Sequence, residues 1–238
     1  MQWYVDNGWL PPIPEEGEVP ANLEDCSWNM IQQLVKADTF KNYYKVGDTK
    51  SITLSSGEVV YIQVASINDG SGDASVWYPK GTVDFISKDC LQTKYAMNGS
   101  AWNDSELRKT LNDTIINNLP IDLKNIITEK NHTYYVGASS HLDSFDKLWL
   151  PTLYELTGSN GLIGNEKVNC NIKYPIFSDD SSRIKCLGNN GSANHWLTSS
   201  LYVNPSTNIR YHIFINTNGA ETWNTENYRG VPICFRVG

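Results

Sequence analysis

Long apolar runs are missing from this sequence. Among its 238 residues, no stretch approaches the ~20 consecutive apolar residues that a membrane-spanning helix needs. The segment from Met1 to Asp6 has neither basic residues nor a hydrophobic centre, so it does not resemble a secretory signal peptide. If the protein acts outside a cell, we expect it to leave that cell by a route other than secretion.

Basic residues are also scarce. Lys and Arg number 19 against 26 Asp and Glu, which gives a net charge of -7 and an isoelectric point near 5.1. A nucleic-acid-binding domain normally carries a basic stripe, and none is visible here. Repulsion from phosphates and anionic lipids is the expected consequence. We therefore expect neither nucleic acid nor an inserted membrane among the partners.

Cysteine is too rare for a disulfide scaffold. The chain has five cysteines, no two of which form a Cys-x-x-Cys pair, so a zinc ribbon is excluded. Most of the five are expected to be small buried hydrophobic residues. The spacing leaves open a bridge between Cys170 and Cys186 across a hairpin.

Catalytic signatures are absent. The sequence contains no Gly-x-Ser-x-Gly elbow, no His-Glu-x-x-His, no P-loop and no dinucleotide fingerprint. His141, Asp143 and Asp146 could reach one metal ion, but their spacing matches no standard site and favours a solvated loop. Residues 68–73 alternate oxygen-bearing side chains as a calcium loop does, but the glycine and glutamate of such a loop are missing. We expect no enzyme activity, no metal and no cofactor.

The chain divides into a leader and a body. Residues 1–22 contain four prolines among acidic residues, which predicts an extended segment that cannot form a helix. Residues 23–238 are expected to form one recognition domain. The apolar side chains of the leader are expected to dock on the body or on a neighbouring chain. They are Trp3, Tyr4, Trp9 and Leu10.

Hydrophobic periodicity predicts two main helices and several short strands. Ser27 is expected to cap the first helix, and Asp104 or Ser105 the second. Alternation over residues 43–54 and 58–67 predicts a hairpin. The pattern therefore predicts an α+β fold with short antiparallel or mixed sheets and long loops.

Asparagine is concentrated near the C-terminus. It occupies 9 of the 39 positions from 189 to 227, but only 16 of the other 199, so this segment is expected to carry long polar loops on short strands. Five apolar residues are expected to be the buried framework that holds the loops: Trp196, Phe214, Val231, Ile233 and Phe235.

Aromatic and short polar residues are mixed in the same segment. Antibody-like binding loops favour this mixture, because aromatic rings give a large contact area at low entropy cost and short polar groups adapt their hydrogen bonds. The alternative is that these loops are only a solvated surface. The expected ligand-binding residues are Tyr202, Asn204, Asn208, Arg210, Tyr211, Asn216, Asn218, Trp223, Asn224, Asn227 and Tyr228.

An ordered set of short motifs runs through the chain. The motifs are Leu23-Glu24-Asp25-Cys26-Ser27-Trp28, Tyr44-Lys45-Val46-Gly47-Asp48-Thr49-Lys50, Met97-Asn98, Trp102-Asn103-Asp104-Ser105-Glu106-Leu107-Arg108-Lys109-Thr110-Leu111-Asn112, Leu119-Pro120-Ile121-Asp122-Leu123, Lys147-Leu148-Trp149-Leu150-Pro151, Trp196-Leu197-Thr198-Ser199-Ser200, Asn216-Thr217-Asn218-Gly219 and Gly230-Val231-Pro232-Ile233-Cys234-Phe235-Arg236-Val237. This set resembles an uncharacterised domain family that is common in phage proteins and in surface proteins of gut bacteria. The resemblance covers about residues 23 to 238.

The resembled family is similar to the C-type-lectin fold, which the formylglycine-generating enzymes and the target proteins of diversity-generating retroelements share. In those targets a C-terminal segment is rewritten through adenines, and adenine-rich codons encode asparagine. The paired cysteines of the formylglycine-generating site cannot be placed on this chain, so that activity is not carried over. The tripeptide from Trp102 to Asp104 also occurs in calcium-dependent lectins, but here it opens a helix and favours capping.

The resemblance implies a non-enzymatic receptor-binding module of a phage virion, at a tail fibre or tail tip. Its partners would be a host-surface glycan or protein and other virion proteins, and its location the virion. A homo-oligomer is expected, trimers being common for such tips. The alternative is a structural decoration or adaptor protein that docks through residues 1–22.

Overall fold

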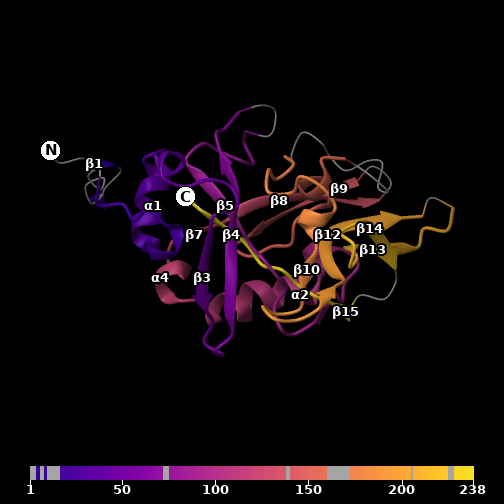
Figure 1. Cartoon of the computed structure of the whole chain (residues 1–238). Coiled ribbons are helices and arrows are strands. Elements are labelled where there is room, and N and C mark those ends of the chain that lie inside the picture. The colour runs from indigo at the N-terminus through magenta and orange to yellow at the C-terminus, as the bar shows by residue number, and fades with distance from the viewer. Residues whose placement is uncertain are drawn as a thin grey trace.

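The arrangement of the chain is described from a computed structural model (Figure 1). The structure describes residues 4–5, 8–9, 17–71, 75–137, 140–159, 172–204, 206–224 and 228–238.

A five-stranded antiparallel sheet lies at the centre of the fold. Its strand order is β3-β4-β5-β16-β7, so β16, which is last in sequence, lies between β5 and β7. Phe235 pairs with Phe85, and their rings stack with centroids 5.3 Å apart. The strands are β3 (Thr49–Thr53), β4 (Val59–Asn68), β5 (Thr82–Ser87), β16 (Cys234–Val237) and β7 (Ile127–Thr128).

Helix α1 (Trp28–Lys36) packs near this sheet and is the first expected helix. The Ser27 side chain caps it by accepting a hydrogen bond from the Met30 backbone N–H. Its apolar face is buried, and the Trp28 ring meets Phe85 and Phe235 edge to face at 5.8 and 6.0 Å. Helix and sheet are therefore joined by aromatic contacts.

The second main helix is a continuous run of α2 (Glu106–Lys109), a π-helical stretch η4 (Thr110–Ile115) and α3 (Ile116–Asn118). Ser105 caps it by accepting a hydrogen bond from the Arg108 backbone N–H, whereas Asp104 accepts one from Ala101. Of the two expected capping residues, Ser105 is therefore the cap of this helix. The mixed α+β fold with short antiparallel sheets and two main helices is confirmed.

A second sheet is built from the C-terminal third of the chain. Strands β12 (Trp196–Val203), β13 (Arg210–Ile215) and β14 (Glu221–Asn224) form an antiparallel meander, drawn in orange at the right of Figure 1. The hairpin of β8 (Lys130–Gly137) and β9 (Ser140–Asp146) packs beside it through β8 and β12.

The remaining elements are short. The helical ones are α4 (Ile121–Lys124), α5 (Leu153–Thr157), η1 (Leu23–Asp25), η2 (Phe40–Asn42), η3 (Trp102–Asp104) and η7 (Ser181–Arg183). The strands are the pairs β1 (Tyr4–Val5) with β2 (Gly8–Trp9), β6 (Tyr95–Ala96) with β15 (Tyr228–Arg229), and β10 (Lys185–Cys186) with β11 (Ala193–Asn194).

The expected framework residues are in the core. Trp196, Val231, Ile233 and Phe235 are fully buried, and Phe214 is 4 % exposed. Four cysteines are free thiols, namely Cys26, Cys90, Cys186 and Cys234, while Cys170 lies outside the described residues.

The leader is described only in part. Strands β1 and β2 pair Tyr4 with Trp9, whereas Trp3 and Leu10 lie outside the described residues. The docking role of these four residues and the domain boundary at residue 22 stay predictions. Within the ranges given above, no helix is long and apolar enough to span a bilayer.

Candidate functional site

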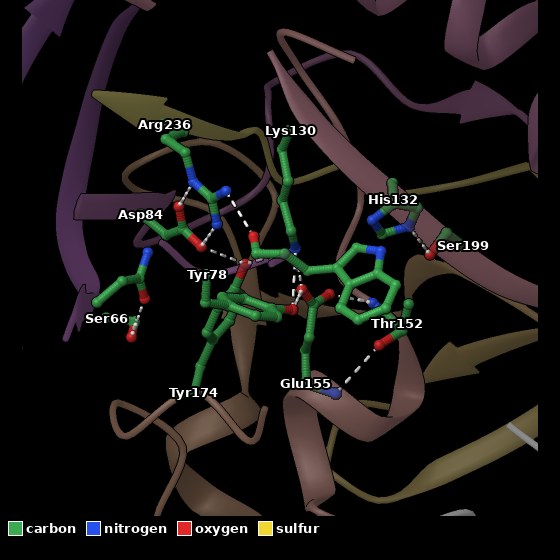
Figure 2. Close-up of polar contacts among 12 residues, drawn as sticks. Ser66, Tyr78, Asp84, Lys130, His132, Thr152, Glu155, Tyr174, Ser199 and Arg236 are labelled. Carbon is green, nitrogen blue, oxygen red and sulfur yellow. Dashed lines mark hydrogen bonds and ion pairs between the residues drawn. The ribbon is translucent and has the colours of Figure 1, made fainter. Parts of the chain in front are cut away.

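A buried ion pair joins strand β8 to helix α5 (Figure 2). Lys130, on β8, pairs with Glu155, on α5, and the two side chains are 1 % and 0 % exposed. The second carboxylate oxygen of Glu155 accepts a hydrogen bond from the Thr152 backbone N–H at 2.7 Å, and Thr152 Oγ1 in return accepts one from the Glu155 backbone N–H. This capping box fixes the carboxylate at the start of α5.

Aromatic rings enclose the Lys130 ammonium. Its Nζ lies 4.6 Å from the ring centroid of Tyr78, 4.9 Å from Trp149 and 5.5 Å from Tyr174. Tyr78 donates a hydrogen bond to Glu155 at 2.5 Å. The cation is therefore desolvated but compensated by one carboxylate and by ring faces.

A second buried pair continues the network into the central sheet (Figure 2). Arg236, on β16, donates to both carboxylate oxygens of Asp84, on β5, at 2.6 and 2.8 Å. Tyr174 donates to the same carboxylate at 3.1 Å. Together the two pairs tie β5 and β16 to β8 and α5.

Burial and charge set the protonation of this network. Burial raises the pKa of Glu155, but the neighbouring Lys130 ammonium outweighs it, and the net pKa falls to about 2. Burial lowers the pKa of His132 to about 4. At neutral pH the Glu155 carboxylate is therefore ionised and the His132 ring is neutral.

His132 and Ser199 have the separation of a base and a nucleophile. Nε2 of His132 lies 2.7 Å from Oγ of Ser199. Both residues are only 1 % exposed, so a dissolved substrate cannot reach the hydroxyl. This contact holds β8 against β12. Its role is therefore structural, as is that of the two ion pairs.

The segment of His141, Asp143 and Asp146, expected to be a solvated loop, is strand β9, and both of its aspartates hold other partners. Asp146 is fully buried and accepts hydrogen bonds from Arg108 Nε at 2.5 Å and Trp102 Nε1 at 2.9 Å. Asp143 accepts a hydrogen bond from Thr133 Oγ1. In the part of the chain that the structure describes, no group of three or more His, Cys, Asp or Glu side chains could hold a metal ion.

The C-terminal sheet carries a cluster of three aromatic rings on one face, which we call the aromatic triad: Tyr202, Tyr211 and Trp223. Tyr202 pairs directly with Tyr211 across β12 and β13, and Trp223 on β14 pairs with Ile213. Alternate residues of a strand share a face, so Tyr211 and Ile213 point to the same side as Trp223. The triad is thus a consequence of strand register.

The rings of the triad contact one another. Their centroids lie 5.9 Å apart for Tyr202 and Tyr211, 5.3 Å for Tyr202 and Trp223, and 4.6 Å for Tyr211 and Trp223. Trp223 is 40 % exposed, while the two tyrosines are half-buried. Next to the triad on the same face, Ile213 is fully buried with Leu153 of α5, and Tyr202 packs against these two residues. The triad therefore lies at the edge of the buried core, with Trp223 as its most exposed ring.

Arg210 and Asn224 lie on the opposite face of this sheet, because each alternates with a triad residue along its strand. Arg210 donates a hydrogen bond to the Ser100 backbone oxygen at 3.2 Å. The two residues are exposed but do not join the triad.

Two of the expected asparagines shape the turn between β12 and β13. The side-chain oxygen of Asn204 accepts hydrogen bonds from the Ser206 and Thr207 backbone N–H groups at 2.9 and 3.2 Å. Asn208 has φ of 56°, a left-handed conformation that asparagine tolerates. This turn lies at the triad end of the sheet, so both residues lie near the rings.

Asn216 and Asn218 lie at the other end of the sheet, in the turn between β13 and β14. The Asn216 side-chain oxygen accepts hydrogen bonds from the Asn218 and Ala220 backbone N–H groups. Gly219 of this turn lies so close to Asp180 that an added Cβ would be 1.6 Å from the Asp180 backbone oxygen. The two asparagines are therefore separated from the triad by the length of β13.

Tyr228 also lies apart, on β15, where it pairs with Ala96 of β6 and is 56 % exposed. Asn227 lies outside the described residues. The predicted set is thus divided, with Tyr202, Asn204, Asn208, Tyr211 and Trp223 at one place.

Sequence reasoning missed one residue of this surface and the whole buried network. Ile209 is 45 % exposed and directly precedes β13. The signal for it was an apolar residue among the polar residues of the turn. The buried network could have been found from charged residues that stand between apolar residues of a strand. Examples are Val83-Asp84-Phe85 and Phe235-Arg236-Val237.

A family model described as a domain of unknown function, DUF6273, matches residues 81–237. The match covers more than half of the chain and includes the triad and both buried ion pairs. No curated protein and no solved structure matches the chain.

Proposed function

Because the chain belongs to the DUF6273 family, whose function is unknown, we propose from its own geometry that it is a binding module. In this proposal the aromatic triad on the C-terminal sheet contacts the ligand. The rest of the domain is the frame that holds the triad in place. The chain would act by reversible recognition and not by catalysis.

The single observation that carries this proposal is the partly exposed aromatic cluster on one sheet face. Tyrosine and tryptophan are the residues that most often dominate binding energy at interfaces. The triad rings already contact one another, so little side-chain entropy remains to be lost when a ligand arrives. The neighbouring turn supplies amides and hydroxyls that can adapt their hydrogen bonds.

The buried network supports the assignment of a frame. Buried hydrogen bonds join the C-terminal sheet to β8 and α5, and Tyr174 links the Lys130–Glu155 pair to the Asp84–Arg236 pair of the central sheet. Substitutions at exposed positions, such as residues 206–209 of the turn beside the triad, usually change stability by less than about 0.5 kcal/mol. This turn can therefore change its contribution to ligand specificity without unfolding the domain.

We propose a C-type-lectin-like fold and a receptor-binding role at the tail fibre or tail tip of a phage virion, toward a host-surface glycan or protein. The asparagine excess between positions 189 and 227 supports a segment diversified through adenine-rich codons. Several copies on one particle would strengthen a weak single site.

A second candidate is a structural decoration or adaptor protein that docks through its leader. The pairing of Tyr4 with Trp9 across β1 and β2 favours it, because a strand pair can add to the sheet edge of a neighbouring chain. In this case removal of residues 1–22 would abolish incorporation into particles, and changes in the triad would not.

The test of the leading proposal is cell binding by triad variants. Fluorescently labelled protein is incubated with a panel of gut-bacterial cells, and bound protein is measured for wild type, Tyr211→Ala and Trp223→Ala. We expect both variants to lose at least tenfold in binding. Tyr61→Ala is the matched control, because Tyr61 is 42 % exposed on the central sheet, close to the 40 % of Trp223. Equal binding by folded triad variants would overturn the proposal.

A further inference from the structure

We propose that the aromatic triad binds a neutral carbohydrate, with the ring of one sugar unit stacked on Trp223 and its edge against Tyr211. This inference rests on the proposed function and names the ligand class of the same surface. It follows from three properties of the triad: the spacing of its rings, the charge around it and its area.

Ring spacing excludes a cation cage. An aromatic cage holds a cation between ring faces. The largest centroid separation in the triad is 5.9 Å, so an atom midway between two rings would lie about 3 Å from each centroid. This is shorter than the 3.5–4.0 Å of van der Waals contact. The ligand must therefore lie on the outside of the triad and not among its rings.

The charges on the C-terminal sheet disfavour an anionic ligand. From residue 196 to residue 224 the charged residues are Arg210 and Glu221. Arg210 points to the opposite face, and Glu221 shares the face of Trp223 but pairs with Ile215, at the end of the sheet far from Tyr211. No positive side chain of this segment faces the rings, and the net charge of -7 repels phosphates and carboxylates.

The area of the triad is too small for a stable protein interface. An aromatic side chain can bury roughly 150–250 Å². Trp223 exposes 40 % of its surface and the two tyrosines less, so the open aromatic area is below about 300 Å². A stable protein interface needs about 800 Å² from each partner. A small ligand that contacts only one or two aromatic rings fits this area better.

A pyranose ring has the required shape and chemistry. One of its faces presents C–H groups, which pack on an aromatic ring, while its rim presents hydroxyls. Next to the triad, the turn formed by Asn204, Ser206, Thr207 and Asn208 is exposed or half-exposed and supplies amide and hydroxyl groups. Ile209 extends the apolar surface at the same end. Weak binding to one sugar unit would become useful through several copies.

The first experiment measures the ligand class directly. The full chain is labelled with 5-fluorotryptophan and measured by ¹⁹F NMR. The Trp223 signal is identified as the resonance that the Trp223→Phe variant lacks. Neutral hexasaccharides of glucose, mannose, galactose and N-acetylglucosamine are then added up to 20 mM. We expect at least one of them to shift the Trp223 signal in a saturable manner, and the Tyr211→Ala variant to weaken that binding at least fivefold. No shift with any of the four overturns the carbohydrate inference.

The second experiment separates this inference from the proposed function. Cells that bind the wild-type protein are treated either with periodate, which cleaves sugar diols, or with protease. Loss of triad-dependent binding after periodate alone supports the inference. If protease alone abolishes it, the binding function stands and the carbohydrate inference fails. If Trp223→Ala and Tyr211→Ala bind the untreated cells like wild type, the proposed function itself fails.

Discussion

Lys130 and Glu155 form an ion pair in which neither side chain exposes more than 1 % of its surface. The pair joins strand β8 to the first turn of α5, and Tyr78 shares the same carboxylate. Burying two charges is costly, and the cost is offset only while both partners and their hydrogen bonds are present. The pair is therefore a sensitive point of the frame that supports the aromatic triad.

Removing one partner of this pair is expected to destabilise the protein strongly. Lys130→Met leaves the Glu155 carboxylate buried without its cation, and we expect a loss of about 3–5 kcal/mol in the free energy of unfolding. Urea denaturation measures it. Lys41→Met is the control, because the Lys41–Asp38 pair is exposed and its loss should leave the free energy of unfolding nearly unchanged. A loss below about 1 kcal/mol for Lys130→Met would contradict the structural role given to the pair.

Stability is expected to fall as the pH is lowered from about 6.5 to about 4. The folded protein holds His132 with a pKa near 4, below the ordinary value of 6.5, because the ring is buried. Between these values the unfolded chain binds a proton that the folded chain does not, so protonation favours unfolding. The full effect of this one group is on the order of 3 kcal/mol.

The contribution of His132 is separable from that of the other histidines. Burial also lowers the pKa of His195 and the pKa of His212, so the wild-type stability curve contains the titration of all three rings. The midpoint of thermal unfolding is measured between pH 7.5 and pH 4 for wild type and for His132→Gln. The glutamine amide does not titrate and keeps a polar group near Ser199. We expect a flatter curve for the variant. Identical slopes would show that His132 does not titrate in this way.

Tyr211 and Trp223 are expected to be energetically coupled. Their ring centroids lie 4.6 Å apart at an angle of 62°, an edge-to-face contact. A double-mutant cycle with Tyr211→Ala and Trp223→Ala should give a coupling energy of about 0.5–1.5 kcal/mol in urea denaturation. The control cycle combines Tyr211→Ala with Tyr61→Ala on the central sheet and should be additive within about 0.5 kcal/mol.

Gly219 is expected to tolerate no side chain. Its φ is 81°, and an added Cβ would lie 1.6 Å from the Asp180 backbone oxygen, so Gly219→Ala must displace the turn between β13 and β14. We expect a loss of at least about 2 kcal/mol from strain and displaced contacts. Gly57 has a similar φ of 86° with nothing within 4 Å, and Gly57→Ala should cost only about 1 kcal/mol. Equal losses would show that close approach adds nothing at Gly219.

Local features were predictable from the sequence. Ser27 capped a helix as expected, because capping depends on residues three positions apart. The apolar runs around Trp196, Phe214 and Phe235 became strands with buried side chains, because the runs are short and bounded by polar turns. Membership of an uncharacterised domain family was also predictable, and it is confirmed over residues 81–237.

Pairing between distant segments was not predictable. Nothing in the local pattern around Tyr202 and Trp223 shows that these residues meet, since their contact depends on the register of two hairpins. The asparagines at 204 and 216 look alike in sequence, but successive turns of a meander lie at opposite ends of the sheet. The buried partners Asp84 and Arg236 are separated by 152 positions, so their pairing is a property of topology alone.

The separation of Asp84 and Arg236 by 152 positions also has a consequence for the folding of the chain during synthesis. While the ribosome is still producing the segment after β5, the hydrogen-bonding edge that β16 will occupy has no partner, and Asp84 has no guanidinium. An incomplete chain would therefore expose an unpaired strand edge and apolar surface for much of its translation, a state prone to aggregation. Completion of this sheet must await release of the last strand from the exit tunnel, and contacts of such long range form slowly.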